Sequence, residues 1–154
     1  MRRIALLLGC SALIMVAAAG VAYAKLIVGT NGPNTLIGTP NADNIRGLDG
    51  ADLIKGKGGS DILLGQRGGD TVQGQAANDS IFGGDGRDQL FGGGGADEIT
   101  GGGGVDHVSA GPGRDIVRVA GDGSVDSVNC GDGTDEVFRD PADDISGCEI
   151  DHTP

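Results

Sequence analysis

Aromatic and basic residues are scarce in this chain. Its 154 residues include no Trp, one Tyr and three Phe, while Gly occurs 32 times. A large conventional core, which aromatic side chains usually help to fill, is therefore excluded. Lys and Arg together number 11 against 22 Asp and Glu, so the formal net charge is −11. Nucleic acids and anionic membrane surfaces need a basic face, so we expect neither as a partner, and cations are favoured.

The segment before Lys25 has the pattern of a signal peptide. Arg2 and Arg3 precede an apolar stretch over residues 4–21, and Ala22-Tyr23-Ala24 has the small-x-small pattern of a cleavage site. We expect cleavage after Ala24, a mature chain that begins at Lys25, and secretion. Cleavage removes two arginines and no acid, so the charge changes from −11 to −11 − 2 = −13.

Two alternatives for this segment stay open. Leu7-Leu8-Gly9-Cys10 resembles a bacterial lipoprotein box, although only five apolar residues precede Cys10, where about 7 to 15 are usual. The second alternative is an uncleaved membrane anchor, because about 18 apolar residues approach the length that spans a bilayer. The Ala-rich run and its cleavage site favour the signal peptide.

The chain that follows repeats every nine residues. Asp recurs at this interval without a slip, and Asn34 stands one period before the first of them. The aspartates are Asp43, Asp52, Asp61, Asp70, Asp79, Asp88, Asp97, Asp106 and Asp115. Two positions after each of these ten residues comes an aliphatic one: Leu36, Ile45, Ile54, Leu63, Val72, Ile81, Leu90, Ile99, Val108 and Val117. A flexible linker or low-complexity tract need not keep this phase, so the pattern predicts folded repeats.

Each nonapeptide has a Gly-rich half and a half suited to a strand of about three residues. Alternation in Asp88-Gln89-Leu90-Phe91 directs Leu90 and its equivalents to one face. One such strand cannot bury its apolar face alone, so repeats must stack. If two repeats form one coil, residues i and i+18 stack about 4.8 Å apart. The period therefore predicts an all-β parallel roll, with Leu36, Ile54, Val72, Leu90 and Val108 in one core column and the alternate aliphatic residues in the facing one.

Three consecutive loops carry a more specific motif. Gly83-Gly84-Asp85-Gly86-Arg87-Asp88, Gly92-Gly93-Gly94-Gly95-Ala96-Asp97 and Gly101-Gly102-Gly103-Gly104-Val105-Asp106 match G-G-x-G-x-D in full. From about Gly29 to Val119 the chain resembles the hemolysin-type, or RTX, family of calcium-binding nonapeptide repeats. The resemblance implies a parallel β-roll over residues 25–119, with Ca²⁺ between the Gly-rich turns of successive coils, held by Asp side chains and loop carbonyls.

The residues themselves also favour calcium. Stacking places Asp52, Asp70, Asp88 and Asp106 along one edge and the other five aspartates along the opposite edge, and carboxylates at this spacing repel each other. Carboxylate and carbonyl oxygens suit a hard cation, and a flexible ring of six or more suits Ca²⁺ better than Mg²⁺. One buried aliphatic residue per repeat offsets little of the ordering entropy, so we expect folding to require calcium. The nine aspartates from Asp43 to Asp115 are the expected ligands.

The loops are not equal. Residues 74–79 have Ala77 at the fourth position and residues 38–43 have Asn41 there, where Gly is expected, so both loops depart from the motif. Residues 29–34 end in Asn34 instead of Asp, which favours an N-terminal cap. His107 follows Asp106 but has no second His at ligand spacing, so we expect it to face solvent.

Residues 120–154 are expected to form an irregular C-terminal coil or cap. After Asp115 the phase slips by two, then Asp126 and Asp135 keep a spacing of nine. Cys130 and Cys148 are separated by two nonapeptide periods, which is one coil of the roll, so stacking places their Cα atoms about 5 Å apart, within disulfide range. In the oxidising compartment that secretion implies, we expect them to form a disulfide that clamps the last coil.

The function expected from the sequence is that of a secreted, monomeric calcium-binding repeat protein without catalytic activity. Between Lys25 and Pro154 there is no His-Glu-x-x-His and no Gly-x-Ser-x-Gly. A calcium-stiffened cell-surface or matrix adhesin or spacer is the alternative. Many relatives leave the cell through a machine that reads an uncleaved C-terminal signal, but this chain has an N-terminal one, so the export route is not inferred.

Overall fold

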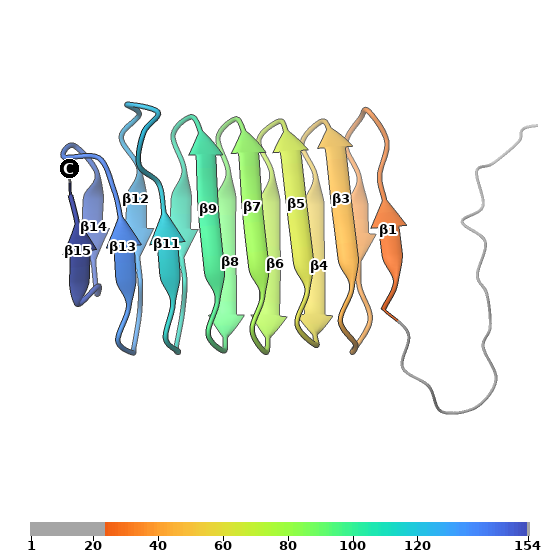
Figure 1. The fold of residues 1–154 in the computed structure, drawn as a ribbon. Helices are drawn as coiled ribbons and strands as arrows, with labels where there is room; N and C mark the ends of the chain where they lie inside the picture. The colour runs from red at the N-terminus through yellow and green to blue at the C-terminus, as the bar shows by residue number, and fades with distance from the viewer. Residues whose placement is uncertain (1–23, 154) are drawn as a thin grey trace, which may run out of the picture.

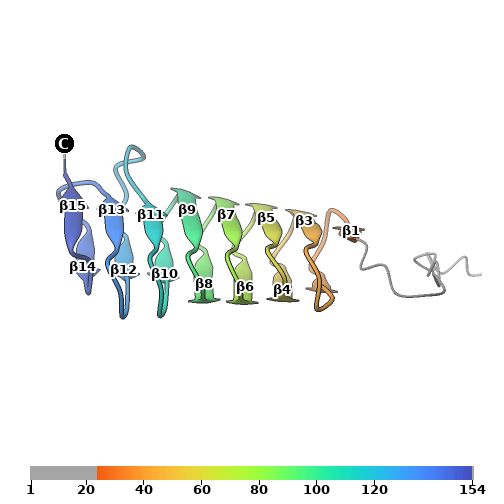
Figure 2. The ribbon, with the colours of Figure 1, turned by 60° about the horizontal axis from the view of Figure 1, so that its bottom comes forward.

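The nonapeptides coil into two parallel β-sheets that face each other along a rod. The structure is a computed structural model that describes residues 24–153 (Figure 1). Residues 1–23 and 154 lie outside the described residues, and so does all of the expected signal peptide except Ala24. Figure 2 shows the coils stacked side by side, with β1 and β15 at opposite ends of the rod. Residues 24–153 contain no helix long and apolar enough to cross a membrane.

Odd-numbered strands form one sheet and even-numbered strands form the other. The first sheet has the order β1 (Leu26–Val28), β3 (Asn44–Asp49), β5 (Ile62–Arg67), β7 (Ser80–Asp85), β9 (Glu98–Gly103), β11 (Ile116–Arg118), β13 (Glu136–Phe138) and β15 (Ile150–His152). The second has the order β14 (Asp144–Ser146), β12 (Ser127–Asn129), β10 (His107–Ser109), β8 (Gln89–Gly94), β6 (Thr71–Ala76), β4 (Leu53–Gly58) and β2 (Thr35–Ile37).

The register confirms two repeats per coil. Ile45 pairs with Leu63 and Leu63 with Ile81, a shift of two nonapeptides each time, and all these pairs are parallel. The second sheet keeps the same shift, for example between Val72 and Leu90. The expected all-β parallel β-roll, a β-solenoid with two nonapeptides in each turn, is therefore confirmed.

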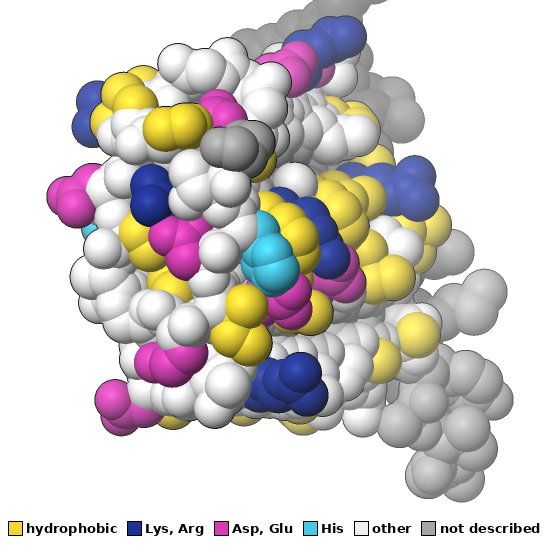
Figure 3. Space-filling model, turned by 60° about the vertical axis from the view of Figure 1, so that its left-hand side comes forward, with side chains coloured by type: hydrophobic (Ala, Val, Ile, Leu, Met, Phe, Trp, Pro, Cys, Tyr) yellow, Lys and Arg dark blue, Asp and Glu magenta, His cyan; other side chains and the backbone are white. Residues whose placement is uncertain are grey.

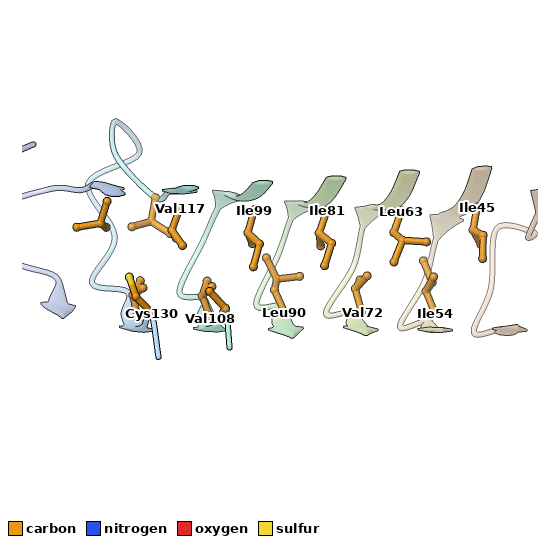
Figure 4. Packing of buried hydrophobic residues seen from close by; sticks show 14 residues of the cluster. Ile45, Ile54, Leu63, Val72, Ile81, Leu90, Ile99, Val108, Val117 and Cys130 are labelled. Atoms are coloured by element: carbon orange, nitrogen blue, oxygen red, sulfur yellow. The ribbon is translucent and has the colours of Figure 1, made fainter. Parts of the chain in front are cut away.

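The core consists of the two predicted aliphatic columns. Figure 4 shows one row of side chains from each sheet pointing toward the other row. From Ile45 to Val117 every member of the columns is 0 % exposed, whereas Leu36, in the first coil, is only half-buried. The aliphatic residue of each repeat therefore supplies the hydrophobic core.

The central strands are longer than the expected three residues. β3 to β9 have six residues each, because the first part of the Gly-rich half also pairs with the next coil. Leu48 pairs with Gln66 and Asp49 with Arg67, although Leu48 and Gln66 have φ of 84° and 85°. Left-handed residues within a ladder bend the strand into the turn, so strand and turn overlap.

The coils change length after Asp115. His107 pairs with Ser127 and Ile116 with Glu136, a longer shift than in the central roll, because two extra residues lie between Asp115 and Asp126. Ser127 pairs with Asp144, which is a shift one residue shorter than two nonapeptides.

The structure confirms the Cys130–Cys148 disulfide, with Cα atoms 5.2 Å apart. The register of the paired strands β12 and β14 is one residue short of two nonapeptides, so Cys148 lies one residue beyond strict stacking. Gly147, directly before Cys148, has φ of 69°, a conformation that favours Gly.

Candidate metal centres

An Asp residue precedes almost every strand of the central roll and is buried there. The nine predicted ligands are between 0 % and 3 % exposed. Asp52, Asp70 and Asp88 precede strands of one sheet, and Asp61 and Asp79 precede strands of the other. Because the strands of the two sheets run in opposite directions (Figure 1), the two Asp sets lie along opposite edges of the rod, as the sequence predicts.

One oxygen of each carboxylate holds neighbouring coils together. Oδ1 of Asp88 accepts a hydrogen bond from the backbone N–H of Asp70, and Oδ1 of Asp106 accepts one from the N–H of Asp88, at 2.8 and 2.9 Å. The same bond recurs along both edges from Asp61 to Asp135 at 2.7–2.9 Å. Sequence reasoning missed this structural role, which a pattern of residue types does not reveal.

The second oxygen has no such partner. Among the described residues, ten Oδ2 atoms are buried without a hydrogen-bond partner: those of Asp52, Asp61, Asp70, Asp79, Asp88, Asp97, Asp106, Asp115, Asp126 and Asp135. Buried carboxylate oxygens are rarely left unpaired, because losing water without a replacement partner is costly. A regular series of such atoms, one per half-coil, therefore points to a ligand that they share.

Carbonyl oxygens of the adjacent coil lie close to these carboxylates. A Cβ added at Gly83 would lie 2.4 Å from Oδ2 of Asp88 and 2.5 Å from the carbonyl oxygen of Gly101. The corresponding glycines from Gly47 to Gly92 each face an Asp Oδ2 and a carbonyl of the next coil in the same way. The first Gly of the motif thus keeps open a cradle in which two oxygens converge.

The donor set fits calcium. Carboxylate and carbonyl oxygens are the hard ligands that Ca²⁺ takes in flexible geometry. Within residues 24–153 no three His, Cys, Asp or Glu side chains converge on one point, so backbone carbonyls must complete the shell of any cation held here. The chain would thus hold a cation with one or two aspartates and the loop backbone.

Burial shifts the acidity of these aspartates. Loss of solvent raises the pKa of Asp79 to about 7 and that of Asp88 to about 6, the N–H donor of the preceding coil opposes the rise, and the carboxylate one coil earlier adds to it. Burial likewise raises the pKa of three more aspartates to about 6: Asp106, Asp115 and Asp126. It also raises the pKa values of Asp61, Asp70 and Asp97. A cation beside these oxygens would offset the cost of their charge.

The first two loops differ from the rest. Oδ2 of Asp43 accepts hydrogen bonds from the backbone N–H and the hydroxyl of Thr39, and Oδ1 of Asn34 accepts one from the N–H of Thr30. In the following loops, from Leu48 to Gly111, the equivalent residue has positive φ and its N–H does not reach the carboxylate. The loop of Asp43 therefore supplies hydrogen-bond donors to the Oδ2 that is unpaired in the later aspartates.

The loop that precedes Asp79 carries strain. Gln75 and Ala77 have φ of 84° and 81°, whereas Gly84 and Gly86 occupy the same positions in the next loop of the chain. Each non-Gly residue in this region costs roughly 1–2 kcal/mol. Asp79 is nevertheless buried, and its Oδ2 is as unpaired as that of Asp88.

Two candidate ligands were missed in the sequence. Asp126 and Asp135 are 1 % and 0 % exposed, accept the N–H groups of Asp106 and Asp115, and have unpaired Oδ2 atoms. Their Asp-x-Val pattern and spacing of nine were visible in the sequence, but the two-residue slip after Asp115 and the fewer glycines before them argued against including them among the ligands. The series ends at Asp143, whose two oxygens both accept backbone hydrogen bonds. His107 is exposed.

Comparison with known proteins identifies the repeat. The family model of the RTX calcium-binding nonapeptide repeat matches residues 28–63, 64–99 and 82–117. Together these ranges span residues 28–117, which is more than half of the chain. No curated protein and no solved structure matches the chain. Since the family model covers this much of the chain and the cradles fit the cation, the protein belongs to the family of RTX calcium-binding nonapeptide repeats.

Proposed function

We propose that this protein is a secreted calcium-binding repeat protein that folds when several Ca²⁺ ions bind between its Gly- and Asp-rich turns. The observation that carries the proposal is the series of ten buried, unpaired Oδ2 atoms from Asp52 to Asp135. The cation would supply the positive charge that these oxygens lack, and so its binding energy would become folding energy. The fold itself serves this role, and we propose no catalytic activity.

The proposed ligands form a graded series. Asp52, Asp61, Asp70, Asp79, Asp88, Asp97, Asp106 and Asp115 combine burial with an unpaired Oδ2, and Asp126 and Asp135 extend the series. Asp43 belonged to the expected set, but Thr39 already satisfies its Oδ2. We therefore propose the strongest sites in the loops that end at Asp88, Asp97 and Asp106, where the motif is complete, and the weakest at Asp43.

A calcium titration followed by far-UV circular dichroism tests the proposal. β-Structure should appear cooperatively with Ca²⁺ and should not appear with the same concentration of Mg²⁺, which demands a tighter octahedral shell. A spectrum that is already fully folded in chelator, or that responds equally to both ions, would contradict the proposal.

Three matched substitutions assign the ligands. Asp97→Asn keeps the Oδ1 that accepts the N–H of Asp79 but removes the charge, so it should raise the calcium midpoint of folding most. Asp79→Asn should raise it less, because its loop is already strained, and Asp43→Asn should raise it least. Equal shifts would mean that motif quality does not rank the sites, and no shift in any variant would remove these aspartates as ligands.

Secretion rests on residues 1–24 and needs its own test. Amino-terminal sequencing of protein recovered from the culture medium should begin at Lys25. Recovery of the protein only in membranes, with residues 1–24 attached, would favour the uncleaved anchor, and a lipid on Cys10 would favour the lipoprotein.

A calcium-stiffened adhesin or spacer is the second candidate, and the shape of the molecule favours it. The coils form a straight rod, and β1 lies at the opposite end from β15 (Figures 1 and 2). A rod with its two ends far apart can hold attached parts at a set distance. Recovery of the native protein from the cell surface, with release by chelator, would support the spacer, whereas free protein in the medium would support the first candidate.

A further inference from the structure

Among residues 24–153, nothing fully covers the core at the N-terminal end of the roll. Ile27 and Leu36, which continue the two core columns into the first coil, are only partly buried, whereas Ile45 and Ile54 behind them are 0 % exposed. Within residues 24–153, β1 pairs only with β3 and β2 only with β4, so each presents one unpaired backbone edge. Such edges are templates for a further strand.

The side chains at this end are apolar. Leu26 and Val28 on β1 are 64 % and 50 % exposed, and Ile37 on β2 is 46 % exposed. Lys25 is the one charged residue of residues 24–42, in a chain whose net charge is −11. Residues 24–42 contain no acidic residue, so two copies that met at this end would not bring acidic side chains of the first coil together.

The C-terminal end is closed in a different way. Asp151 lies opposite Val137, at the end of one core column, and pairs with Arg139 through oxygen and nitrogen atoms 2.9 Å apart. His152 stacks on Phe138 at 4.4 Å between ring centroids and contacts Glu136 at 2.7 Å. The view of Figure 3 toward this end shows acidic, basic and His side chains among the hydrophobic ones. An apolar N-terminal end docked here would bury an ion pair.

We propose that the N-terminal end docks against the N-terminal end of a second copy of this chain and forms a two-fold dimer. Two N-terminal ends are compatible because both are apolar and carry no acidic residue. The C-terminal end carries ion-paired side chains and is therefore not compatible with an N-terminal end. In this arrangement the edge strands of the two copies pair antiparallel, both sheets continue across the dimer, and Ile27 and Leu36 meet the same core residues of the second copy. A two-fold contact of this kind closes at two copies. The sequence predicts a monomer, and the proposed dimer departs from that prediction because of the exposed first coil.

The proposal concerns association and does not rest on the identity of the calcium ligands. Sedimentation velocity of the purified calcium-loaded protein over a range of concentrations should show a species of twice the mass of the chain. Val28→Lys should leave a monomer, because it places a charge beside the edge of β1. Ile62→Lys is the matched control, since Ile62 is 44 % exposed on β5, away from the end, and its dimer should remain.

Circular dichroism in calcium would show whether the Val28→Lys variant folds. If it does not fold, a second measurement on the unmodified protein still tests the proposal. Hydrogen exchange of the unmodified protein should show that amides in residues 26–37 become more protected as concentration rises, while those in residues 144–152 do not change. A monomer at all concentrations overturns the proposal, and this includes a monomer whose first coil is covered by residues before Ala24. Polymers in which both ends gain protection overturn it too, because they indicate head-to-tail contact, and so does a dimer that Ile62→Lys dissociates and Val28→Lys leaves intact.

Discussion

The central coils and the C-terminal coils bury different groups at the same position. From Gly47 to Gly101 the residue two places after the core aliphatic is Gly, and it lies against an Asp Oδ2. In the next three half-coils this position holds Ala110, Val119 and Cys130, which are buried in the core. A central half-coil thus buries one aliphatic side chain and an unpaired carboxylate oxygen, while a C-terminal half-coil keeps such an oxygen, at Asp115, Asp126 or Asp135, and buries a second apolar side chain as well.

This difference shows how one fold can be stabilised by two means. Where this position holds Gly, the Asp Oδ2 lies against the glycine, no second apolar side chain is buried, and the coil depends more strongly on a cation for its unpaired oxygens. Filling the position adds apolar burial, worth roughly 0.8 kcal/mol per CH₂ group, and in the last coil the Cys130–Cys148 disulfide adds a covalent link. The central coils should therefore respond to calcium more strongly than the C-terminal ones.

Calcium removal should have the largest effect and should act differently on the central and the C-terminal coils. In chelator, amides of β4 to β9 should lose nearly all protection from hydrogen exchange, while those of β12 to β14 should keep part of theirs because of the second buried side chain and the disulfide. Exchange measured by mass spectrometry with and without calcium would resolve the two regions. Equal loss along the whole rod would show that the coils unfold as one unit and that the difference in packing has no energetic consequence.

Acid should partly replace calcium in the central coils. Burial raises the pKa of Asp79 to about 7 and that of Asp88 to about 6, above the ordinary 3.8. The folded, calcium-free roll therefore binds protons more tightly than the unfolded chain, and the resulting stability is present below about pH 4 and is lost as the pH rises through about 6 to 7.

Circular dichroism of the calcium-free protein should accordingly show more β-structure at pH 4 to 5 than at pH 7. With calcium present the sign should reverse, because protons compete for the ligands. Asp79→Asn serves as the control, since it removes the group with the highest pKa. A calcium-free protein whose structure is constant over this range would contradict the shifts.

Substitutions at the position two places after the core aliphatic residue test directly whether Gly there matters. Gly92→Ala would place a methyl group 2.5 Å from both Oδ2 of Asp97 and the carbonyl oxygen of Ala110, so we expect a loss of about 3 kcal/mol and a higher calcium midpoint. The reverse change, Ala110→Gly, should cost about 1 kcal/mol and leave the midpoint nearly unchanged. Denaturant unfolding at saturating calcium measures both. Equal costs would mean that the cradle at Gly92 has no special role.

The disulfide should matter only to the C-terminal coils. Replacing Cys130 and Cys148 by Ala removes the covalent closure of the last coil, which should cost about 3 kcal/mol of local stability. Exchange should rise in residues 127–152 and stay constant in β4 to β8. A variant that also loses protection in the central coils would show that the last coil supports the whole rod.

Relief of the strained loop should have the smallest effect. Ala77→Gly removes a Cβ at φ of 81°, and we expect a gain of about 1 kcal/mol and a slightly lower calcium midpoint. Gly95→Ala, at the same position one coil later, is the matched control and should lose stability, because its Cβ would lie 2.3 Å from the carbonyl oxygen of Ala77. If Ala77→Gly also lost stability, the entropy of the added Gly would outweigh the strain.

Much of the central roll could be predicted because its contacts repeat with the sequence period. A spacing of nine places Ile45 and Leu63 in one column, and the observed register pairs them. The same period predicts the disulfide. The observed distance between the two Cα atoms agrees with the predicted stacking, although the local register differs by one residue. The period failed as a guide after Asp115, where two extra residues lengthen the coil, so Asp126 and Asp135 were not predicted as ligands.

The sequence alone determined the coil, its two columns and the residues that face them, because a fixed period and alternation decide which side chains stack. Only the tertiary structure decided how each carboxylate divides its two oxygens. Oδ1 of Asp88 accepts an N–H from the preceding coil while its Oδ2 lies unpaired against Gly83, whereas Thr39 satisfies Oδ2 of Asp43. The same residue type in the same phase has these two outcomes because its hydrogen bonds depend on the φ of a loop residue four places earlier, which the spacing of the aspartates does not specify.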